Sequence, residues 1–399
     1  MEGKPVVVLS NNDGCLIALT PEAKALGFKM GDIYFQVRHR LEKLGVTAFS
    51  SNYTLYGDLS NRVMQTLETL VPIEQYSIDE SFIPFYPATA VQAIDVGWAV
   101  HDRIRQWVGI PVRVGIGPTR TLAKLANLWA KKRTRVLKID LGTEELEEIL
   151  EATPTGDIWG IGRKQSEKLA KIGISNARQL RDMDTERALK LLTVVGQRTV
   201  LELQGFQCIM EDQTPVPRKT LINSRSFGRR VTQKEDLAQA MAMHCTIAGE
   251  RLRMEKMEAG GLCVQMQTSM HTEEPYFSAS ASVTIPIPTN ITSILIRHAL
   301  EALDKCYQPN HSYMKGGILL FDLQEQGKRQ LTLLESVVSP ENERQTKLMQ
   351  ALDKINDKFG RDTLHYLSQG PKDAFWHMQR KKMSGAFTTR WMELAKAKT

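Results

Sequence analysis

Two adjacent carboxylates, Asp79 and Glu80, lie in the stretch 76–81 and precede the apolar run 82–85. Like charges beside a buried segment are costly unless a cation neutralises them. Carboxylate oxygens are hard ligands that suit Mg²⁺, an ion that keeps several waters and completes its shell with substrate phosphates. Because successive strand residues point to opposite faces, the two acids can share a metal pair only if the backbone turns between them. A solvated turn is the simpler interpretation of an isolated Asp-Glu pair, but the apolar run favours the metal site.

The elements around this pair alternate between short apolar strands and amphipathic helices. We expect the acids at the tip of a strand pair, within an α+β sheet that has its helices packed on one face. The predicted strands of this half are 6–9, 76–85 and 112–116, and the predicted helices are 21–27, 55–70, 91–107 and 119–132.

Several lysines of this half could contact the phosphates of a ligand. Gly115 and Gly117 lie where a strand ends and a helix begins, a place where the backbone can approach a ligand and anions are favoured. Lys124 and Lys131 are two helical turns apart on that helix, so both could reach a bound triphosphate. Lys24, on the first predicted helix, is a further candidate. An ordinary solvated basic face is the alternative for all three lysines.

Length and composition limit the class of protein. The chain has 399 residues, enough for roughly two to four domains. Its formal net charge of +7 favours a polyanionic partner. The five cysteines are scattered, so we expect neither a disulfide framework nor a zinc site. No apolar run approaches the ~18 residues that span a bilayer, and the start lacks the apolar core of a signal peptide. We therefore expect a cytoplasmic protein without a membrane partner.

Residues 157–174 have the pattern of a helix-hairpin-helix. Its turn, which contains Gly160 and Gly162, would present backbone N–H groups to a nucleic-acid phosphate and position a duplex without reading its sequence. Arg163 and Lys164 add positive charge beside the turn. A turn that only joins two packed helices is the alternative, and the flanking cations favour DNA binding.

The C-terminal half begins with a proline-bearing basic linker. The order strand, helix, strand, strand, helix, strand then predicts a split βαβ, ferredoxin-like unit. Arg225 and Arg229, near its first strand, are candidates for contacts with the DNA backbone, although they could serve only as surface charges. The predicted strands are 224–229, 262–268, 276–285 and 317–323, and the predicted helices are 235–257 and 291–307.

An apolar pentapeptide, residues 330–334, stands between polar stretches. Short extended peptides of this kind dock into grooves of partner proteins, and a final edge strand is the alternative. A helix at 345–359 and a basic end follow, and the sequence predicts no compact fold for that end.

In combination these segments resemble a Y-family translesion DNA polymerase of the bacterial UmuC-like branch. The resembling segments are GKPVVVLSNNDGC, EAKALG, FSSNY, YSIDES, VGIGPTRTLAKLAN, DIWGIGR, SRSFG and QLTLL, and they cover nearly the whole chain in the family's order. The resemblance implies a right-hand polymerase with small fingers, a ferredoxin-like palm, a helix-hairpin-helix thumb and a ferredoxin-like little finger. Its parts would be fingers with a remnant of the N-terminal palm (1–52), palm (53–150), thumb (151–212), linker (213–223), little finger (224–328), and a clamp-binding peptide with the C-terminal region (329–399).

The resemblance also implies roles for individual residues. Asp79 would ligate two catalytic Mg²⁺ ions, and Glu80 would assist at the metal that activates the primer 3′ hydroxyl. Lys131 would hold the β and γ phosphates of the incoming dNTP, with Lys24 beside it. The remaining assignments are Gly160, Gly162, Arg163, Lys164, Arg225 and Arg229 to DNA, and Gln330, Leu331, Leu333 and Leu334 to a sliding clamp, with Leu334 replacing the more usual aromatic end.

The implied partners are primer-template DNA, dNTPs, the sliding clamp, a UmuD-type subunit and a recombinase filament of the SOS response. The sequence departs from the family in one respect, because the strand that carries a third catalytic carboxylate and an aromatic steric gate, upstream of GKPVVV, is absent from it. Asp13 does not replace that carboxylate, since the family has this residue too, in a loop. A misplaced start or a truncated product would explain the difference. We expect the former, because a palm sheet without its central strand leaves backbone groups unpaired.

Two functions therefore stay open for the chain as written. One is an impaired DNA polymerase, and the other is a catalytically silent DNA- and clamp-binding protein. A nucleotide cyclase would share the carboxylate chemistry but would not explain the helix-hairpin-helix or the basic linker.

Overall fold

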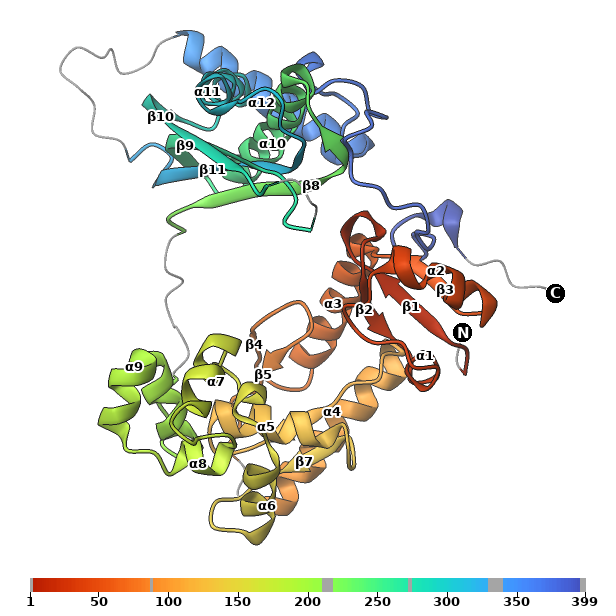
Figure 1. The fold of residues 1–399 in the computed structure, drawn as a ribbon, viewed down its shortest axis with the longest axis vertical. Coiled ribbons are helices and arrows are strands. Elements are labelled where there is room, and N and C mark those ends of the chain that lie inside the picture. The colour runs from red at the N-terminus through yellow and green to blue at the C-terminus, as the bar shows by residue number, and fades with distance from the viewer. Residues whose placement is uncertain (1–2, 87–88, 210–217, 272–274, 329–339, 395–399) are drawn as a thin grey trace. The chain divides into compact units, whose positions relative to one another are not determined.

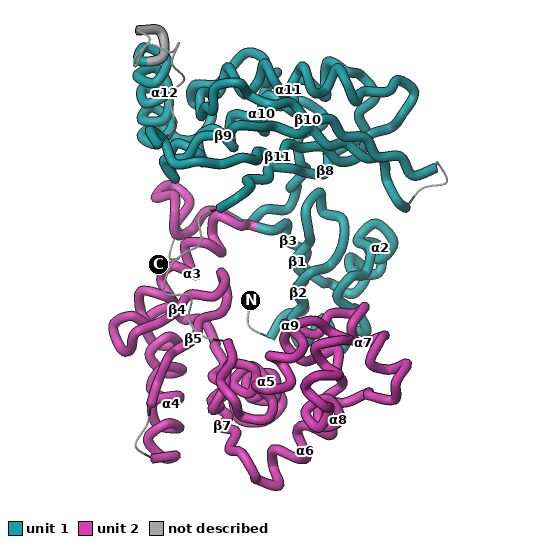
Figure 2. Tube along the Cα trace, turned by 90° about the vertical axis from the view of Figure 1, so that its left-hand side faces the viewer, with its two compact units in different colours: residues 1–51, 216–384 teal, residues 52–215, 385–399 magenta. Residues whose placement is uncertain are grey.

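The computed structural model describes residues 3–86, 89–209, 218–271, 275–328 and 340–394. It divides the chain into two units (Figure 2). The first unit contains residues 1–51 and 216–384, and the second contains residues 52–215 and 385–399. Within the described ranges, every helix is too short or too polar to cross a bilayer.

The N-terminal part of the first unit is a three-stranded sheet with a small core of its own. β1 is central, antiparallel to β2 and parallel to β3. The predicted strand at 6–9 is confirmed, whereas α2 and β3 were not predicted because few of their residues are buried. The elements are β1 (Val6–Leu9), η1 (Asn11–Asp13), β2 (Leu16–Leu19), α1 (Pro21–Ala25), α2 (Tyr34–Lys43) and β3 (Thr47–Ser50). Val7, Leu9, Leu16, Phe28 and Leu41 form the core.

The larger part of the first unit is a four-stranded antiparallel sheet that packs against two long helices (Figure 1). The strand order β10-β9-β11-β8 places β11 between β8 and β9, the two strands that α10 connects, so the predicted split βαβ arrangement is confirmed. The elements are β8 (Leu221–Val231), α10 (Lys234–Met254), β9 (Met257–Gln267), β10 (Ser278–Thr289), α11 (Thr292–Cys306) and β11 (Tyr313–Glu325).

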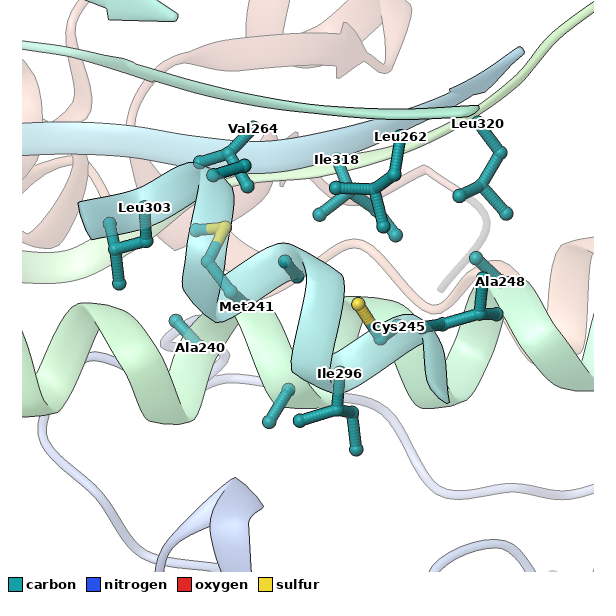
Figure 3. Close-up of a cluster of buried hydrophobic side chains, with 14 of the residues drawn as sticks. Ala240, Met241, Cys245, Ala248, Leu262, Val264, Ile296, Leu303, Ile318 and Leu320 are labelled. Carbon is teal, nitrogen blue, oxygen red and sulfur yellow. The ribbon is translucent and has the colours of Figure 1, made fainter. Parts of the chain in front are cut away.

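The core of this part lies between the sheet and the helices. Alternate residues of the central strands point toward the helices, as the period of two in a strand requires. Figure 3 shows this packing, with Leu262, Val264, Ile318 and Leu320 from the strands and Ala240, Met241, Cys245, Ala248, Ile296 and Leu303 from the helices.

Residues 340–384 pack within the first unit, although the sequence predicted no compact fold for the chain that follows the helix at 345–359. α12 (Pro340–Phe359) is joined to α10 by Asp353, which accepts hydrogen bonds from Nε and Nη2 of Arg253 at 2.6 and 2.8 Å. Further along, η3 (Leu367–Gln369) contacts α10, and Trp376 is only 2% exposed within the main core. Residues 340–384 are therefore an integral part of the first unit.

Residues 376–383, here called the C-terminal strap, join the two sheets of the first unit. Asn12 is central to this junction, since its Nδ2 donates to the carbonyls of Ser226 and Phe227 at 3.0 Å and its Oδ1 accepts from the amide of Gln379 at 2.9 Å. Ser50 and Lys382 exchange two further hydrogen bonds, each of 2.9 Å. The strap thereby fixes the N-terminal sheet to the edge strand β8.

The second unit is mainly helical. Two short strand pairs lie among its helices, β4 antiparallel to β5 and β6 parallel to β7. Its elements are α3 (Tyr53–Glu68), β4 (Glu74–Gln75), β5 (Ser81–Phe82), α4 (Ala90–Trp107), β6 (Val114–Ile116), α5 (Arg120–Ala130), β7 (Val136–Lys138), α6 (Glu144–Ala152), η2 (Thr155–Asp157), α7 (Arg163–Ala170), α8 (Ala177–Arg181), α9 (Thr185–Leu203) and η4 (Trp391–Glu393).

One expectation for this unit is corrected. The predicted strand at 76–85 is wrong, because β4 and β5 are two residues long and flank a turn, and Pro84 cannot donate to a strand ladder. Gly115 and Gly117 have a packing role that the sequence did not reveal, because they allow β6 to lie against α5. A Cβ at Gly115 would lie 2.2 Å from the amide nitrogen of Asn127.

His244 provides a prediction of pH dependence in the first unit. It is fully buried on α10, where its Nδ1 lies 2.7 Å from Oδ1 of Asn223 on β8. Burial, and secondarily the charge of Arg225, lowers the pKa of His244 to about 3. Above its unfolded pKa near 6.5 the residue is neutral in both states and adds no pH dependence.

As the pH falls below that value, only the unfolded chain gains the proton, so the fold should lose up to about 1.4 kcal/mol per pH unit. His244→Asn keeps a donor for Asn223 and should remove this dependence. The measurement is amide hydrogen exchange of α10 at about pH 5 and about pH 7, with His271→Asn at an exposed position as the control. An equal pH response of the wild type and His244→Asn would contradict the assignment.

Gly228 provides a test of the strap. Its amide donates to the carbonyl of Trp376 at 2.9 Å, and a Cβ at this position would lie 2.2 Å from the carbonyl oxygen of His377. Gly228→Ala should therefore displace the strap at a cost of about 1–3 kcal/mol, seen as faster amide exchange at Gln379 and Lys382. Gly57→Ala, where the added Cβ meets no atom within 4 Å, is the control. Unchanged exchange in Gly228→Ala would show that the strap does not depend on this contact.

Candidate active site

Asp79 and Glu80 lie on a tight turn, residues 76–81, here called the acidic turn. The amides of Tyr76 and Ser77 both donate to the carbonyl of Glu80, at 3.1 and 3.0 Å. Oγ of Ser60, on α3, donates to the carbonyl of Ile78. The backbone thus bends between the strands β4 and β5, as two neighbouring acids need if they are to face the same ions.

Each carboxylate of the acidic turn has a defined partner. Oγ of Ser77 donates to Oδ1 of Asp79 at 2.7 Å, which orients this carboxylate while leaving it exposed. Glu80 forms an ion pair with Lys124, whose Nζ lies 2.6 Å from Oε1. Lys124, considered for triphosphate binding on sequence grounds, is therefore bonded to a predicted metal ligand.

The other two candidate lysines are both exposed. Lys131 is exposed at the C-terminal end of α5. Lys24 is exposed on α1, which belongs to the first unit. Their proposed contacts with nucleotide phosphates stay predictions.

A cluster that the sequence did not reveal supports the hairpin. Arg120, on α5, donates to both carboxylate oxygens of Glu74 at 2.8 and 2.5 Å, and its guanidinium lies 5.0 Å from the ring centre of Phe82. The rings of Tyr76, Phe82 and Trp159 contact one another with centroids 5.6–5.8 Å apart. Trp159 comes from the helix-hairpin-helix, so this cluster joins that motif to the acidic turn.

The helix-hairpin-helix has its apolar residues inside and its charges outside. Ile158 and Ile161 are buried in the core of the unit, whereas Gly160, Arg163 and Lys164 are exposed. Gly160 has a φ of +91°, which glycine adopts without strain. The amide of Gly162, predicted to face a phosphate, instead donates to Oε1 of Gln165 at 3.2 Å. A phosphate would have to replace that bond.

Glu202 is a buried carboxylate that sequence reasoning missed. It is fully buried at the end of α9 and accepts from the amides of Thr121 at 2.8 Å and of Cys208 and Ile209 at 3.0 Å each. Its backbone carbonyl accepts from Oγ1 of Thr119 at 2.9 Å. Glu202 therefore fixes the start of α5 to α9 and to the chain that follows.

The carboxylates of the acidic turn are hard oxygen ligands of the kind that suit a magnesium ion. Asp79 and Glu80 are exposed on one turn, and Mg²⁺ needs only one or two protein carboxylates when water and substrate phosphates fill its shell. Among the described residues, no group of three or more histidines, cysteines or acids gathers closely enough to hold a metal ion. The two carboxylates fit a metal that shares its shell with a substrate.

The remaining sequence candidates lie on β8 of the first unit or outside the described residues. Arg225 and Arg229 are exposed on the edge strand β8, and Arg225 is close enough to His244 to influence its charge. The peptide 330–334, with Gln330, Leu331, Leu333 and Leu334, lies outside the described residues.

Sequence models of known families match most of the chain. The impB/mucB/samB family matches residues 1–127, and the C-terminal domain of that family matches residues 218–333. The helix-hairpin-helix motif of the IMS family matches residues 143–174, and a domain of unknown function matches residues 346–397.

Relatives and solved structures agree with these matches. Protein UmuC of Salmonella typhimurium is 40% identical over 402 residues, covering 99% of this chain and 94% of the relative. Protein SamB of the same species is 40% identical over 406 residues, covering 100% and 95%. A Y-family DNA polymerase chimera of Dbh and Dpo4 has a TM-score of 0.62 at 18% identity, covering 82% of this chain and 93% of that chain.

The fold is that of a Y-family DNA polymerase, so the predicted polymerase fold is confirmed. The chain belongs to the impB/mucB/samB family, in its UmuC-like branch, and is by class a DNA-directed DNA polymerase.

Glu202 provides a prediction for the second unit. A glutamine has a single acceptor oxygen and places an NH₂ group against one of the donors, so Glu202→Gln should destabilise the junction by about 1–3 kcal/mol. Hydrogen exchange at the amides of Thr121, Cys208 and Ile209 should then become faster. Glu186→Gln, at an exposed position on the same helix, is the control. Unaltered exchange at all three amides would contradict this role of Glu202.

Proposed function

We propose that this chain is a translesion DNA polymerase that adds deoxynucleotides to a primer opposite damaged template bases. The acidic turn is the observation that carries the proposal. It holds two carboxylates on a hydrogen-bonded hairpin that is braced by α5 and by a helix-hairpin-helix. The match to UmuC along nearly the whole chain supports the same function.

Asp79 and Glu80 would hold Mg²⁺ for nucleotidyl transfer. When bound, this metal would lower the pKa of the primer 3′ hydroxyl and neutralise charge on the α phosphate. Ser77 orients Asp79 through a hydrogen bond of 2.7 Å, so its carboxylate does not have to be ordered when the substrate arrives. Lys131 is exposed at the end of α5 and would bind the β and γ phosphates of the dNTP.

The chain would bind the sugar-phosphate backbone of the DNA. The exposed Gly160, Arg163 and Lys164 of the helix-hairpin-helix, with Gly162 beside them, would contact phosphates without reading the sequence. Arg225 and Arg229 on β8 would add contacts of the same kind. Such contacts agree with a polymerase that accepts altered bases, because none of them depends on base identity.

The similarity to UmuC supports a proposal for the partners. Residues 330–334 would bind a sliding clamp, and a UmuD-type subunit and a recombinase filament would act with the chain in the SOS response in the cytoplasm. The domain boundaries at residues 52, 150, 212, 223 and 328 belong to the same proposal.

A second function is favoured by the carboxylate count. Only two acids gather at the acidic turn, and within the described ranges no third one joins them. The alternative is therefore a catalytically silent protein that binds primed DNA and the clamp.

Primer extension with Mg²⁺ separates the two functions. The wild-type chain should extend a primer, and Asp79→Asn, which removes a metal ligand while conserving size, should reduce the rate at least about 100-fold. Asp95→Asn, an exposed acid on α4, is the control and should behave as the wild type. Primer extension by Asp79→Asn at the wild-type rate would contradict the catalytic assignment. Binding of primed DNA by the wild type without extension would establish the silent alternative.

A further inference from the structure

Lys124 is bonded directly to a proposed metal ligand. Its Nζ lies 2.6 Å from Oε1 of Glu80, and its side chain is 19% exposed against 43% for Glu80. The ammonium group also lies 5.3 Å from the ring centre of Tyr76 and 5.7 Å from that of Trp159. A carboxylate and two aromatic rings therefore hold this cation in place.

The position of Lys124 on α5 strengthens this arrangement. Arg120 precedes it by four residues, and residues four apart share one face of a helix. Arg120 binds Glu74 at the β4 end of the hairpin, while Lys124 binds Glu80 at the β5 end. The same face of α5 thus holds both ends of the hairpin that carries the acidic turn.

We propose that Lys124 is a positioning residue that holds Glu80 in the acidic turn before a metal binds and competes with divalent cations for that carboxylate. A unit positive charge 2.6 Å from Oε1 repels a second cation at the same group. The other oxygen, Oε2, can still ligate a metal. The identity of the metal rests on the proposed function, whereas the contact between Lys124 and Glu80 does not.

This competition has a consequence for the order of binding. A carboxylate already neutralised by an ammonium group binds a free divalent ion weakly. A metal that arrives with a triphosphate brings further oxygen ligands and needs less from the protein. Lys124 therefore biases the acidic turn toward a metal that is already bound to nucleotide.

A direct measurement of metal binding to the full chain, without DNA or nucleotide, tests the proposal. Tb³⁺ binds carboxylate sites, and its luminescence is excited by nearby aromatic rings, here Tyr76 and Trp159. Mg²⁺ is then titrated to displace it. Lys124→Gln should tighten the binding of both ions about two- to fivefold, the effect expected of a partly exposed ion pair. Lys124→Arg keeps the charge and should bind them as the wild type does.

Two further variants make the test specific. Lys132→Gln removes a cation that lies over the ring of Trp129, 4.5 Å from its centre, and should leave metal binding unchanged. In a chain that carries Glu80→Gln, the effect of Lys124→Gln should disappear, since the competition requires the Glu80 carboxylate. A lysine with only a general structural role would not produce this coupling.

Three results would overturn the proposal. The first is absence of Tb³⁺ binding at the acidic turn of the wild type, and the second is unchanged or weaker binding of Tb³⁺ and Mg²⁺ by Lys124→Gln. The third is a Lys124→Gln variant that resembles Lys131→Gln by raising only the KM for dNTP. The last result would assign Lys124 to triphosphate binding. If the expected shifts occur but the wild type does not extend primers, the proposed polymerase function fails and the role of Lys124 stands.

Discussion

The second unit depends on the ion pairs between one face of α5 and the hairpin of β4 and β5. Arg120 and Glu74 are 16% and 24% exposed, so removing either would leave a partly buried charge without its partner. The opposite face of α5 packs into the main core of the unit through Leu122, Leu125 and Ala126. The helix therefore transmits the rigidity of that core to two strands of two residues each, which would not be stable alone.

Much of this organisation could be predicted because it depends on local patterns. Helices such as α3, α4 and α10 carry apolar residues at helical spacing, and their predicted limits agree with the structure within a few residues. The split βαβ arrangement follows from the order of its elements alone. The bend at Asp79 and Glu80 could be anticipated because two neighbouring acids on a regular strand would face opposite sides.

Other features could not be predicted because they depend on contacts between residues distant in sequence. Lys124 is 44 positions away in the sequence from Glu80, its ion-pair partner. The carboxylate of Glu202 accepts a hydrogen bond from the amide of Thr121, which is 81 positions away. Trp376 stands in a polar stretch without periodicity, so its burial against the four-stranded sheet has no local signal. The strand predicted at 76–85 failed for a related reason, since the hydrogen bonds of the turn itself compete with strand pairing.

The C-terminal strap has a consequence for the solution behaviour of the molecule. β8 is the outer strand of its sheet, and outer strands expose backbone groups that can pair with another chain. One of these groups, the amide of Gly228, donates a hydrogen bond to the carbonyl of Trp376, and the indole ring of Trp376 packs into the adjoining core. Fragments that end before the strap would expose both the strand edge and the apolar surface beneath Trp376, and so would be prone to aggregate at concentrations where the intact chain stays dispersed.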